Sequence, residues 1–408
     1  MKKVWDKWTR IALVKRILVG LILGAILGIA VPQATGIAIL GDVFVSALKA
    51  IAPLLVFFLV ISSLCNAGKS HGGVIKTVII LYMFSTVLAA VIAVFASMAF
   101  PVKMTLANAA TDTSAPQGIV EVLNNLLLNV VANPVSSLVN ANYVGILMWA
   151  VLLGLAFRAA DKMTKKVLAD VADGISMVVT WIINLAPFGI FGLVFNTVST
   201  NGLDIFTTYG KLLLLLVGCM LFIYFVTNPL LVYWCIRQNP YPLIFHCLKR
   251  SALTAFFTRS SAANIPVNMK VCEEMGLDRD TYSVTIPLGA TINMDGAAIT
   301  ITVMTMATAF TLGIHVDIPT AIILSLLAAL SACGASGVAG GSLLLIPMAC
   351  SLFGISDDIS MQVVAVGFII GVVQDSVETA LNSSSDLLLS ASAEFRQWRV
   401  EGKEIKFK

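Results

Sequence analysis

Acidic, amide and hydroxyl side chains recur at helical spacing near the C-terminal end of the chain. The apolar stretch 364–389 carries, in order, Asp375, Glu378, Thr379, Asn382 and Asp386. Intervals of three and four residues put these side chains on one face of a helix. Three carboxylates on one face of a membrane helix are costly unless cations meet them. The pattern therefore predicts cation binding inside an apolar medium.

The composition indicates what surrounds this face. Of 408 residues, 58% are hydrophobic and 12% are charged, whereas soluble domains have about 45–50% apolar and about 25% charged residues. Long apolar runs predict an all-α, polytopic membrane protein with roughly eight to ten passes. The net charge of +4 comes from basic residues that flank the apolar runs, so we expect a lipid environment and no nucleic-acid partner.

Six apolar regions precede the C-terminal half. We expect spans at 13–31, 40–66, 74–100, 171–198 and 209–236, and a broken or multi-part helix within 118–157. The N-terminal segment is basic and amphipathic and lacks a small-residue cleavage site, so we interpret it as interfacial. Most of the 26 Lys and Arg residues fall in alternate loops. This bias predicts that both termini are cytoplasmic and that the number of full spans is even.

Two segments in the C-terminal half do not fit full spans. Residues 241–270 contain basic and small polar residues in their middle, and residues 319–353 consist of two apolar arms around GASGVAGG. Each of these arms would be roughly 20 Å long, short of the roughly 30 Å hydrocarbon core. We expect two re-entrant hairpins of opposite topology, followed by helices at 282–312 and 361–389. Inverted repeats with broken helices are typical of secondary transporters.

The tip of the first expected hairpin, FFTRSSAANIPVN, offers the hydroxyls of Ser260 and Ser261 and free helix N-termini to a carboxylate. The alternative is a small-residue packing motif. Arg259 makes that alternative less attractive, because a buried arginine requires an anionic partner.

The stretch PLGATINMDGAAIT contains Asn293 and Asp295, which an intact helix would point apart. Local unwinding between Gly289 and Gly296 would let their oxygens converge on a hard cation. The alternative is a glycine-kinked helix that tolerates an aspartate.

The second expected hairpin has a glycine-rich tip at 332–342, which could act as an external gate or simply allow close packing.

The amide and hydroxyl oxygens near the carboxylates favour sodium over a proton relay, which stays the alternative. We find no nucleophile with a base beside it, so we do not expect an enzyme. A channel fits an occluded, charged site less well than a transporter does.

At these four stretches the sequence resembles the dicarboxylate/amino acid:cation symporter family, which has the glutamate-transporter fold. TRSS…P, NMDG, the glycine-rich tip and D-x-x-x-T-x-x-N-x-x-x-D carry the resemblance. It implies eight transmembrane helices, two re-entrant hairpins and a homotrimer in a bacterial inner membrane. It also implies scaffold helices in 1–73 and 101–208, a moving transport domain formed by 74–100 and 209–391, and a basic cytoplasmic tail at 392–408.

The resemblance further implies ligand sets, with sodium as the coupling ion and no other cofactor. One sodium site would use Gly289, Asn293, Asn382 and Asp386. A second would use Thr291, Ala332, Cys333 and Ala335, mainly through carbonyls. A third would use Tyr82, Ser85, Thr86, Asn293 and Asp295. The amino-acid substrate would contact Ser260, Ser261, Asp375, Thr379 and Asn382, with Asp375 on its ammonium group.

One departure from the family pattern concerns the substrate. Members that carry acidic substrates have an arginine three residues after the amino-binding aspartate, and Glu378 occupies that position here. A carboxylate repels a dicarboxylate but accepts a hydrogen bond from a hydroxyl, as in the bacterial serine/threonine:sodium branch that the sequence resembles. We therefore expect import of serine and threonine, with Glu378 either contacting the substrate or neutralising Arg259. The alternative is a sodium- or proton-coupled symporter for glutamate, aspartate or C4-dicarboxylates.

Overall fold

The computed structural model describes residues 11, 13–66, 73–106, 128, 131–202, 204–333, 335 and 340–405. All regular structure in these ranges is helical, which confirms the expected fold class. Several expected features lie largely outside the described residues: the N-terminal interfacial segment, the first apolar piece of 118–157 and the centre of the glycine-rich tip.

The described chain consists of long helices and short helical elements. The N-terminal half contains α2 (Leu13–Ala30), η1 (Thr35–Ala38), α3 (Ile39–Asn66), α4 (Gly73–Ala99), α6 (Pro134–Val139), α7 (Tyr143–Ala156), η2 (Phe157–Ala159), α8 (Lys162–Asn184) and α9 (Ala186–Asn201). The C-terminal half contains α10 (Asp204–Phe222), η3 (Ile223–Thr227), α11 (Asn228–Ile236), α12 (Tyr241–Cys247), η4 (Leu248–Ala252), α13 (Leu253–Thr258), α14 (Ser261–Glu274), α15 (Arg279–Ile292), α16 (Asp295–Thr311), α17 (Ile318–Ala332), η5 (Ser342–Leu345), α18 (Ile346–Ser351) and α19 (Asp357–Val400).

Six described helical stretches are long and apolar enough to cross a membrane. They are Thr35–Ser62, Gly73–Ala99, Lys162–Asn184, Phe206–Ile236, Arg279–Thr311 and Asp357–Val400. Helices satisfy their own backbone hydrogen bonds, as a lipid environment requires. These stretches support a multi-pass membrane protein, while the expected total of eight spans and two hairpins stays a prediction.

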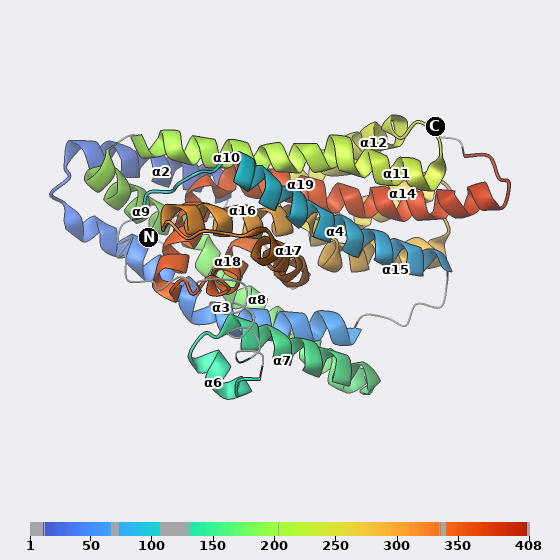
Figure 1. Ribbon diagram of the computed structural model, residues 1–408, viewed down its shortest axis with the longest axis horizontal. Helices are drawn as coiled ribbons and strands as arrows, with labels where there is room; N and C mark the ends of the chain where they lie inside the picture. The colour runs from blue at the N-terminus through green and yellow to red at the C-terminus, as the bar shows by residue number, and fades with distance from the viewer. Residues whose placement is uncertain are drawn as a thin grey trace.

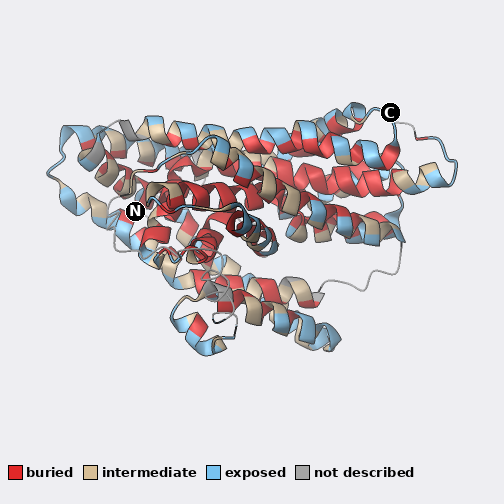
Figure 2. Cartoon of the chain, in the orientation of Figure 1, coloured by how far each residue is buried: buried red, intermediate tan, exposed pale blue. Residues whose placement is uncertain are grey.

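Many polar side chains lie in the interior of this molecule beside its apolar core, and many large apolar side chains lie on its outside. Figure 1 shows α19 running lengthwise beside α10 and α16, and Figure 2 shows that α16 and much of α19 are buried. The outward face of α2, by contrast, exposes large apolar side chains such as Leu18, Ile22 and Ile26. This distribution suits a lipid solvent and leaves the polar face of α19 in the protein interior.

α19 is longer than the sequence indicated. We expected a helix at 361–389, but α19 has 44 residues and is therefore about 66 Å long at about 1.5 Å per residue. Contacts beyond the apolar stretch hold its C-terminal turns. The rings of Phe395 and Trp398 pack edge to face with centroids 5.0 Å apart, and the Arg396 guanidinium lies 5.3 Å from the ring centroid of Trp234. The first part of the expected tail is therefore helical.

The expected single helix at 171–198 is wrong. Helix α8 starts earlier, at Lys162, and ends at Asn184, while α9 begins at Ala186. Pro187 explains the break between them, because a proline inside a helix has no N–H to donate and its ring clashes with the carbonyl four residues back. Lys162, Lys165 and Lys166 lie in the first turns of α8.

Glycines on α2 allow it to pack closely on α9. Gly20, Gly24 and Gly28 follow one another at intervals of four residues, and a Cβ atom on each would lie 2.2, 2.6 and 2.9 Å from a carbonyl oxygen of α9. Small residues at this spacing let two membrane helices approach each other. α3 in turn packs against α7, α8 and α9, so α2, α3, α7, α8 and α9 form one packed group.

Two helix breaks position the polar residues. α15 ends at Ile292 and α16 begins at Asp295, so the backbone is non-helical at Asn293 and Met294 (φ −98°, ψ 81° and φ −119°, ψ 51°). The unwinding expected around Asn293 is confirmed. In the first hairpin segment α13 ends at Thr258, and Arg259 adopts a left-handed conformation with φ 52° before α14 begins.

Candidate functional site

The polar face of α19 meets both helix breaks in the protein interior. Asp375, Glu378, Thr379, Asn382 and Asp386 are all buried. The structure divides them among separate groups of partners rather than gathering them at one point. These groups join α19 to the tips of both hairpin segments, to α16 and η5, and to the break before α16. The face is therefore a line of adjacent polar sites along one helix.

Asp375 forms an ion pair with the guanidinium group of Arg259. The Nε atom of Arg259 lies 2.6 Å from Asp375 Oδ2, and both side chains are largely buried, with 11% and 5% exposed. The backbone N–H of Gly340 donates to Asp375 Oδ1 at 3.2 Å. Asp375 therefore connects α19 to the tips of both hairpin segments.

Among the described contacts Glu378 forms no ion pair with Arg259, which bonds Asp375, so the structure does not support the second of the two roles expected for Glu378. Its Oε2 atom accepts hydrogen bonds from Thr300 Oγ1 at 2.7 Å, Ser342 Oγ at 2.9 Å and Gln374 Nε2. The guanidinium lies instead on Asp375, one helical turn away. Gln374 also donates to Thr300 Oγ1 at 2.8 Å, which closes a small network of neutral donors around the carboxylate.

Sequence reasoning missed the partners of Glu378. Gln374 precedes Glu378 by four residues, a spacing at which helical side chains touch, so its role was readable from the sequence. Thr300 and Ser342 come from α16 and η5, and only tertiary packing brings them here.

Asp386 lies against the unwound segment between α15 and α16. Asn293 Nδ2 donates to Asp386 Oδ1 at 2.9 Å, and the Tyr82 hydroxyl donates to the backbone oxygen of Asp386 at 2.8 Å. A Cβ atom on Gly289 would lie 2.8 Å from Asp386 Cγ, so only glycine fits between the two helices here. The structure brings together the residues expected at one sodium site.

Asn293 keeps an oxygen without a hydrogen-bond partner. Its Oδ1 atom is buried and accepts no hydrogen bond from the described residues. A buried unsatisfied acceptor in a folded protein is uncommon and requires an explanation. Amide and carboxylate oxygens are the ligands that hard cations prefer, and Asp386 lies next to this one.

Asp295 begins α16 and contacts α4. Ser85 Oγ donates to Asp295 Oδ2 at 2.7 Å and Thr86 Oγ1 donates to Oδ1 at 3.2 Å. The N–H of Met294 donates to Thr86 Oγ1 at 3.3 Å. The serine and threonine side chains of α4 therefore contact the helix break.

Asn382 ties α19 to the start of α16. The N–H of Gly296 donates to Asn382 Oδ1 at 2.7 Å. A Cβ atom on Gly296 would lie 2.9 Å from the Glu378 Cα atom, so the two helix backbones nearly touch. The amide side chain of Asn382 thus stabilises an N–H that the first turn of α16 leaves unpaired.

Of the residues expected at the second sodium site, Ala332, Cys333 and Ala335 lie at or just after the C-terminal end of α17, whereas Thr291 lies in the last turn of α15. Cys333 Sγ donates to the backbone oxygen of Ile292 at 3.5 Å, which brings this end to the helix break. Ala332 and Ala335 are joined by a backbone hydrogen bond of 2.9 Å. The exposed Thr291 hydroxyl donates to the carbonyl of Leu288 within its own helix.

The two serines of the first hairpin segment lie at the start of α14. Ser260 caps this helix, since its Oγ atom accepts a hydrogen bond from the Ala263 N–H at 3.2 Å, and Ser261 is buried. Deeper in α14, Asn264 and Asn268 both donate to Ser383 of α19, to Oγ at 2.8 Å and to the backbone oxygen at 2.8 Å respectively. This attachment of α14 to α19 was not predicted.

Comparisons with known proteins agree with this geometry. Residues 13–394 match the model of the sodium:dicarboxylate symporter family. The chain is 57% identical to the serine/threonine transporter SstT of Bifidobacterium adolescentis over 406 residues, 99% of this chain and 94% of the relative. It is 55% identical to the serine/threonine transporter SstT of Streptococcus thermophilus over 400 residues, 98% of this chain and 100% of the relative. The resemblance found in the motifs is confirmed, and the chain belongs to the sodium:dicarboxylate symporter family.

Proposed function

We propose that this protein is a sodium-coupled symporter that imports L-serine and L-threonine across the bacterial inner membrane. One observation carries the proposal: the carboxylates of Asp295, Asp375, Glu378 and Asp386 are buried around a helix break. Among the described residues, a single ion pair, that of Arg259 with Asp375, reaches them. Cations that enter and leave with the substrate would supply the missing charge.

Sodium would bind where oxygens converge on the unwound segment. Asp386 and Asn293, with carbonyl oxygens near Gly289 and Asn382, would form one site. Asp295 with Ser85, Thr86 and Tyr82 would form another, and the carbonyls around Thr291, Cys333 and Ala335 a third. The unpartnered Oδ1 of Asn293 supports the first assignment, because a sodium ion would satisfy it.

The amino-acid substrate would lie between the first hairpin tip and α19. Asp375 would bind its ammonium group, while Ser260, Ser261 and Asn382 would contact its carboxylate and Thr379 would line the site. Glu378 would exclude acidic side chains by repulsion. The names of the two relatives, both serine/threonine transporters, support the same substrate class.

Transport would proceed by movement of one domain against another. We assign α4 and α10–α19 to the moving domain and α2, α3 and α6–α9 to a scaffold that forms a homotrimer, with both termini cytoplasmic. Lys49 of α3 bridges to Asp357 and Asp358 of α19 at 3.2 and 2.7 Å. Exposed pairs of this kind contribute only about 0–1 kcal/mol, so they can break during each cycle.

Uptake of labelled serine into proteoliposomes tests the proposal. An inward sodium gradient should drive accumulation, and a proton gradient alone should not. Unlabelled threonine should compete, whereas aspartate, glutamate and succinate should not. Inhibition by aspartate without inhibition by threonine would instead favour an acidic-substrate symporter, and uptake driven by protons alone would refute sodium coupling.

A further inference from the structure

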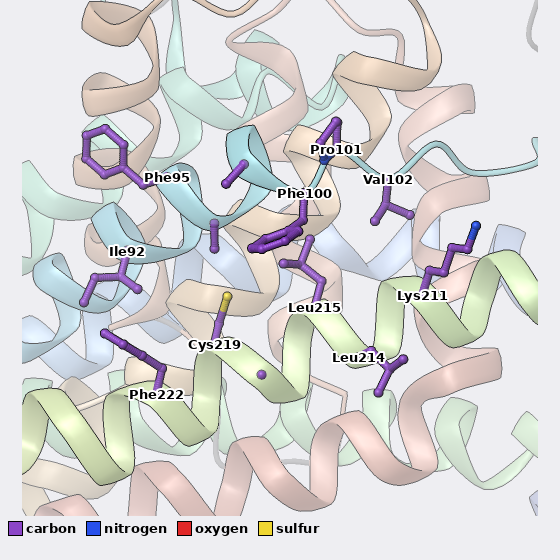
Figure 3. Close-up of a pocket in the computed structure, with 13 residues that line it drawn as sticks. Ile92, Phe95, Phe100, Pro101, Val102, Lys211, Leu214, Leu215, Cys219 and Phe222 are labelled. Atoms are coloured by element: carbon purple, nitrogen blue, oxygen red, sulfur yellow. The ribbon is translucent and has the colours of Figure 1, made fainter.

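A large apolar cavity lies between α4 and α10, away from the polar sites along α19. It has a volume of about 840 Å³ and its lining residues come from these two helices and the chain just after α4 (Figure 3). Cavities that bind small molecules in proteins usually measure about 300–1,000 Å³. The hollow is thus large enough for a ligand, and the proposed transport cycle assigns it no role.

Small residues create the hollow. Ala96 and Ala99 line it from α4, and Gly218 lines it from α10. A Cβ atom added to Gly218 would meet no other atom of the described residues within 4 Å. The space is therefore not filled by neighbouring side chains, and a larger residue at position 218 would project into it without a backbone clash.

The length of the hollow corresponds to one leaflet of a bilayer. Its lining on α10 runs from Lys211 to Phe222, which is roughly 16 Å along a helix. The hydrocarbon core of a membrane is about 30 Å thick. One end reaches Pro101, where α4 has ended, so this end lies where the chain leaves its apolar span.

Lys211 gives that end a positive charge. Lys211 is the one charged residue among the described residues that line the hollow. Figure 3 shows its side chain at the same end of the hollow as Val102. Lysine side chains near the ends of membrane helices extend their ammonium group to the level of the lipid head groups. The hollow therefore has an apolar body of half-bilayer length and a cation at its polar end.

We propose that this hollow is a groove that binds an anionic phospholipid, with one acyl chain along α10 and the phosphate beside Lys211. The lining disfavours a soluble polar ligand, because every other lining side chain in the described part of the chain is apolar or a cysteine thiol. The charge distinguishes an anionic head group from a zwitterionic one, whose own cation would meet the ammonium group. The inference needs only a membrane location and is independent of the substrate.

Native mass spectrometry of the delipidated full-length protein tests this site. Phosphatidylglycerol and phosphatidylcholine with identical acyl chains are titrated separately, and the affinity of the first bound lipid is measured. The wild-type protein should bind phosphatidylglycerol about fivefold more tightly, the factor expected for one lysine beside an anionic head group. Lys211→Gln should remove this preference and leave phosphatidylcholine binding unchanged.

Two further variants separate the groove from general surface attraction. Gly218→Leu should weaken binding of both lipids, because the leucine occupies the space of the acyl chain. Lys103→Gln is the matched control, since Lys103 lies just beyond α4 but does not line the groove, and it should bind like the wild type. Equal binding of the two lipids by the wild type, or equal effects of the two lysine variants, would overturn the proposal.

Discussion

Arg259 and Asp375 form a buried ion pair across 116 residues of sequence, with Nε 2.6 Å from Oδ2. The left-handed backbone at Arg259 (φ 52°) ends α13 at this point. Because Asp375 is also the proposed partner of the substrate ammonium group, substrate binding would exchange one cation for another. The Asp375 carboxylate would then be neutralised by Arg259 in the empty site and by the substrate ammonium group in the loaded site.

Replacement of Asp375 by alanine should abolish serine uptake. The variant loses the proposed ammonium ligand and leaves the Arg259 charge without its partner. Breaking a buried ion pair from one side costs about 3–5 kcal/mol, so the thermal unfolding temperature should also fall. Uptake by proteoliposomes and unfolding of the purified protein measure the two effects.

Ser376→Ala provides the control for this variant. The Ser376 hydroxyl donates to the Val372 carbonyl of its own helix at 2.8 Å, and we assign it no contact with substrate. This variant should transport serine at nearly the wild-type rate. Substantial uptake by Asp375→Ala would remove Asp375 from the substrate site.

The placement of the polar residues on one helix face and at a helix break could be predicted from the sequence. Residue spacing and neighbouring glycines are local signals that do not depend on tertiary packing. The interval from Asp375 to Asp386 specifies one helix face, and the sequence around Asn293 indicated the break. The interval of four residues between Gly20, Gly24 and Gly28 is an equally local signal. Pro187 likewise signalled the end of α8.

The pairing of charges could not be predicted in the same way. Arg259 can reach Asp375 or Glu378 as far as sequence spacing tells, since one helical turn separates the two carboxylates. The choice depends on Thr300 and Ser342, which surround Glu378 with neutral donors. These contacts join distant segments and follow only from tertiary packing.

Asp386→Asn should weaken the dependence of transport on sodium. An amide keeps the size of the side chain but removes the negative charge that a hard cation prefers. We expect the sodium concentration for half-maximal uptake to rise roughly tenfold, which corresponds to about 1.4 kcal/mol. Ser392→Ala is the control, because its hydroxyl bonds only the Leu388 carbonyl among the contacts described. An unchanged sodium requirement in Asp386→Asn would contradict the assigned site.

Gly289→Ala should impair the same sodium site by steric means. The new Cβ atom would lie 2.8 Å from Asp386 Cγ and 2.9 Å from the Tyr82 hydroxyl. Overpacking of this kind costs about 1–3 kcal/mol and would push the carboxylate away from Asn293. Stabilisation of the purified protein by added sodium should therefore shrink, as thermal unfolding with and without sodium can measure.

The matched variant for Gly289→Ala is Gly210→Ala in α10. A Cβ atom at Gly210 meets nothing within 4 Å, and alanine favours a helix over glycine by about 1 kcal/mol. This variant should be as stable as the wild type or slightly more stable, with full stabilisation by sodium. If both variants respond to sodium as the wild type does, close approach at Gly289 does not shape the site.

Glu378→Gln should distinguish a substrate contact from a purely structural role. If the carboxylate accepts a hydrogen bond from the substrate hydroxyl, its neutralisation removes a charged hydrogen bond that contributes about 1.5–3 kcal/mol. We expect KM for serine to rise at least roughly tenfold, while KM for alanine, which has no hydroxyl, stays nearly unchanged. Uptake of the two labelled amino acids by the same preparation provides the comparison. An equal rise for both would mean that Glu378 acts through its bond to Ser342, by holding η5 against α19, rather than on the substrate.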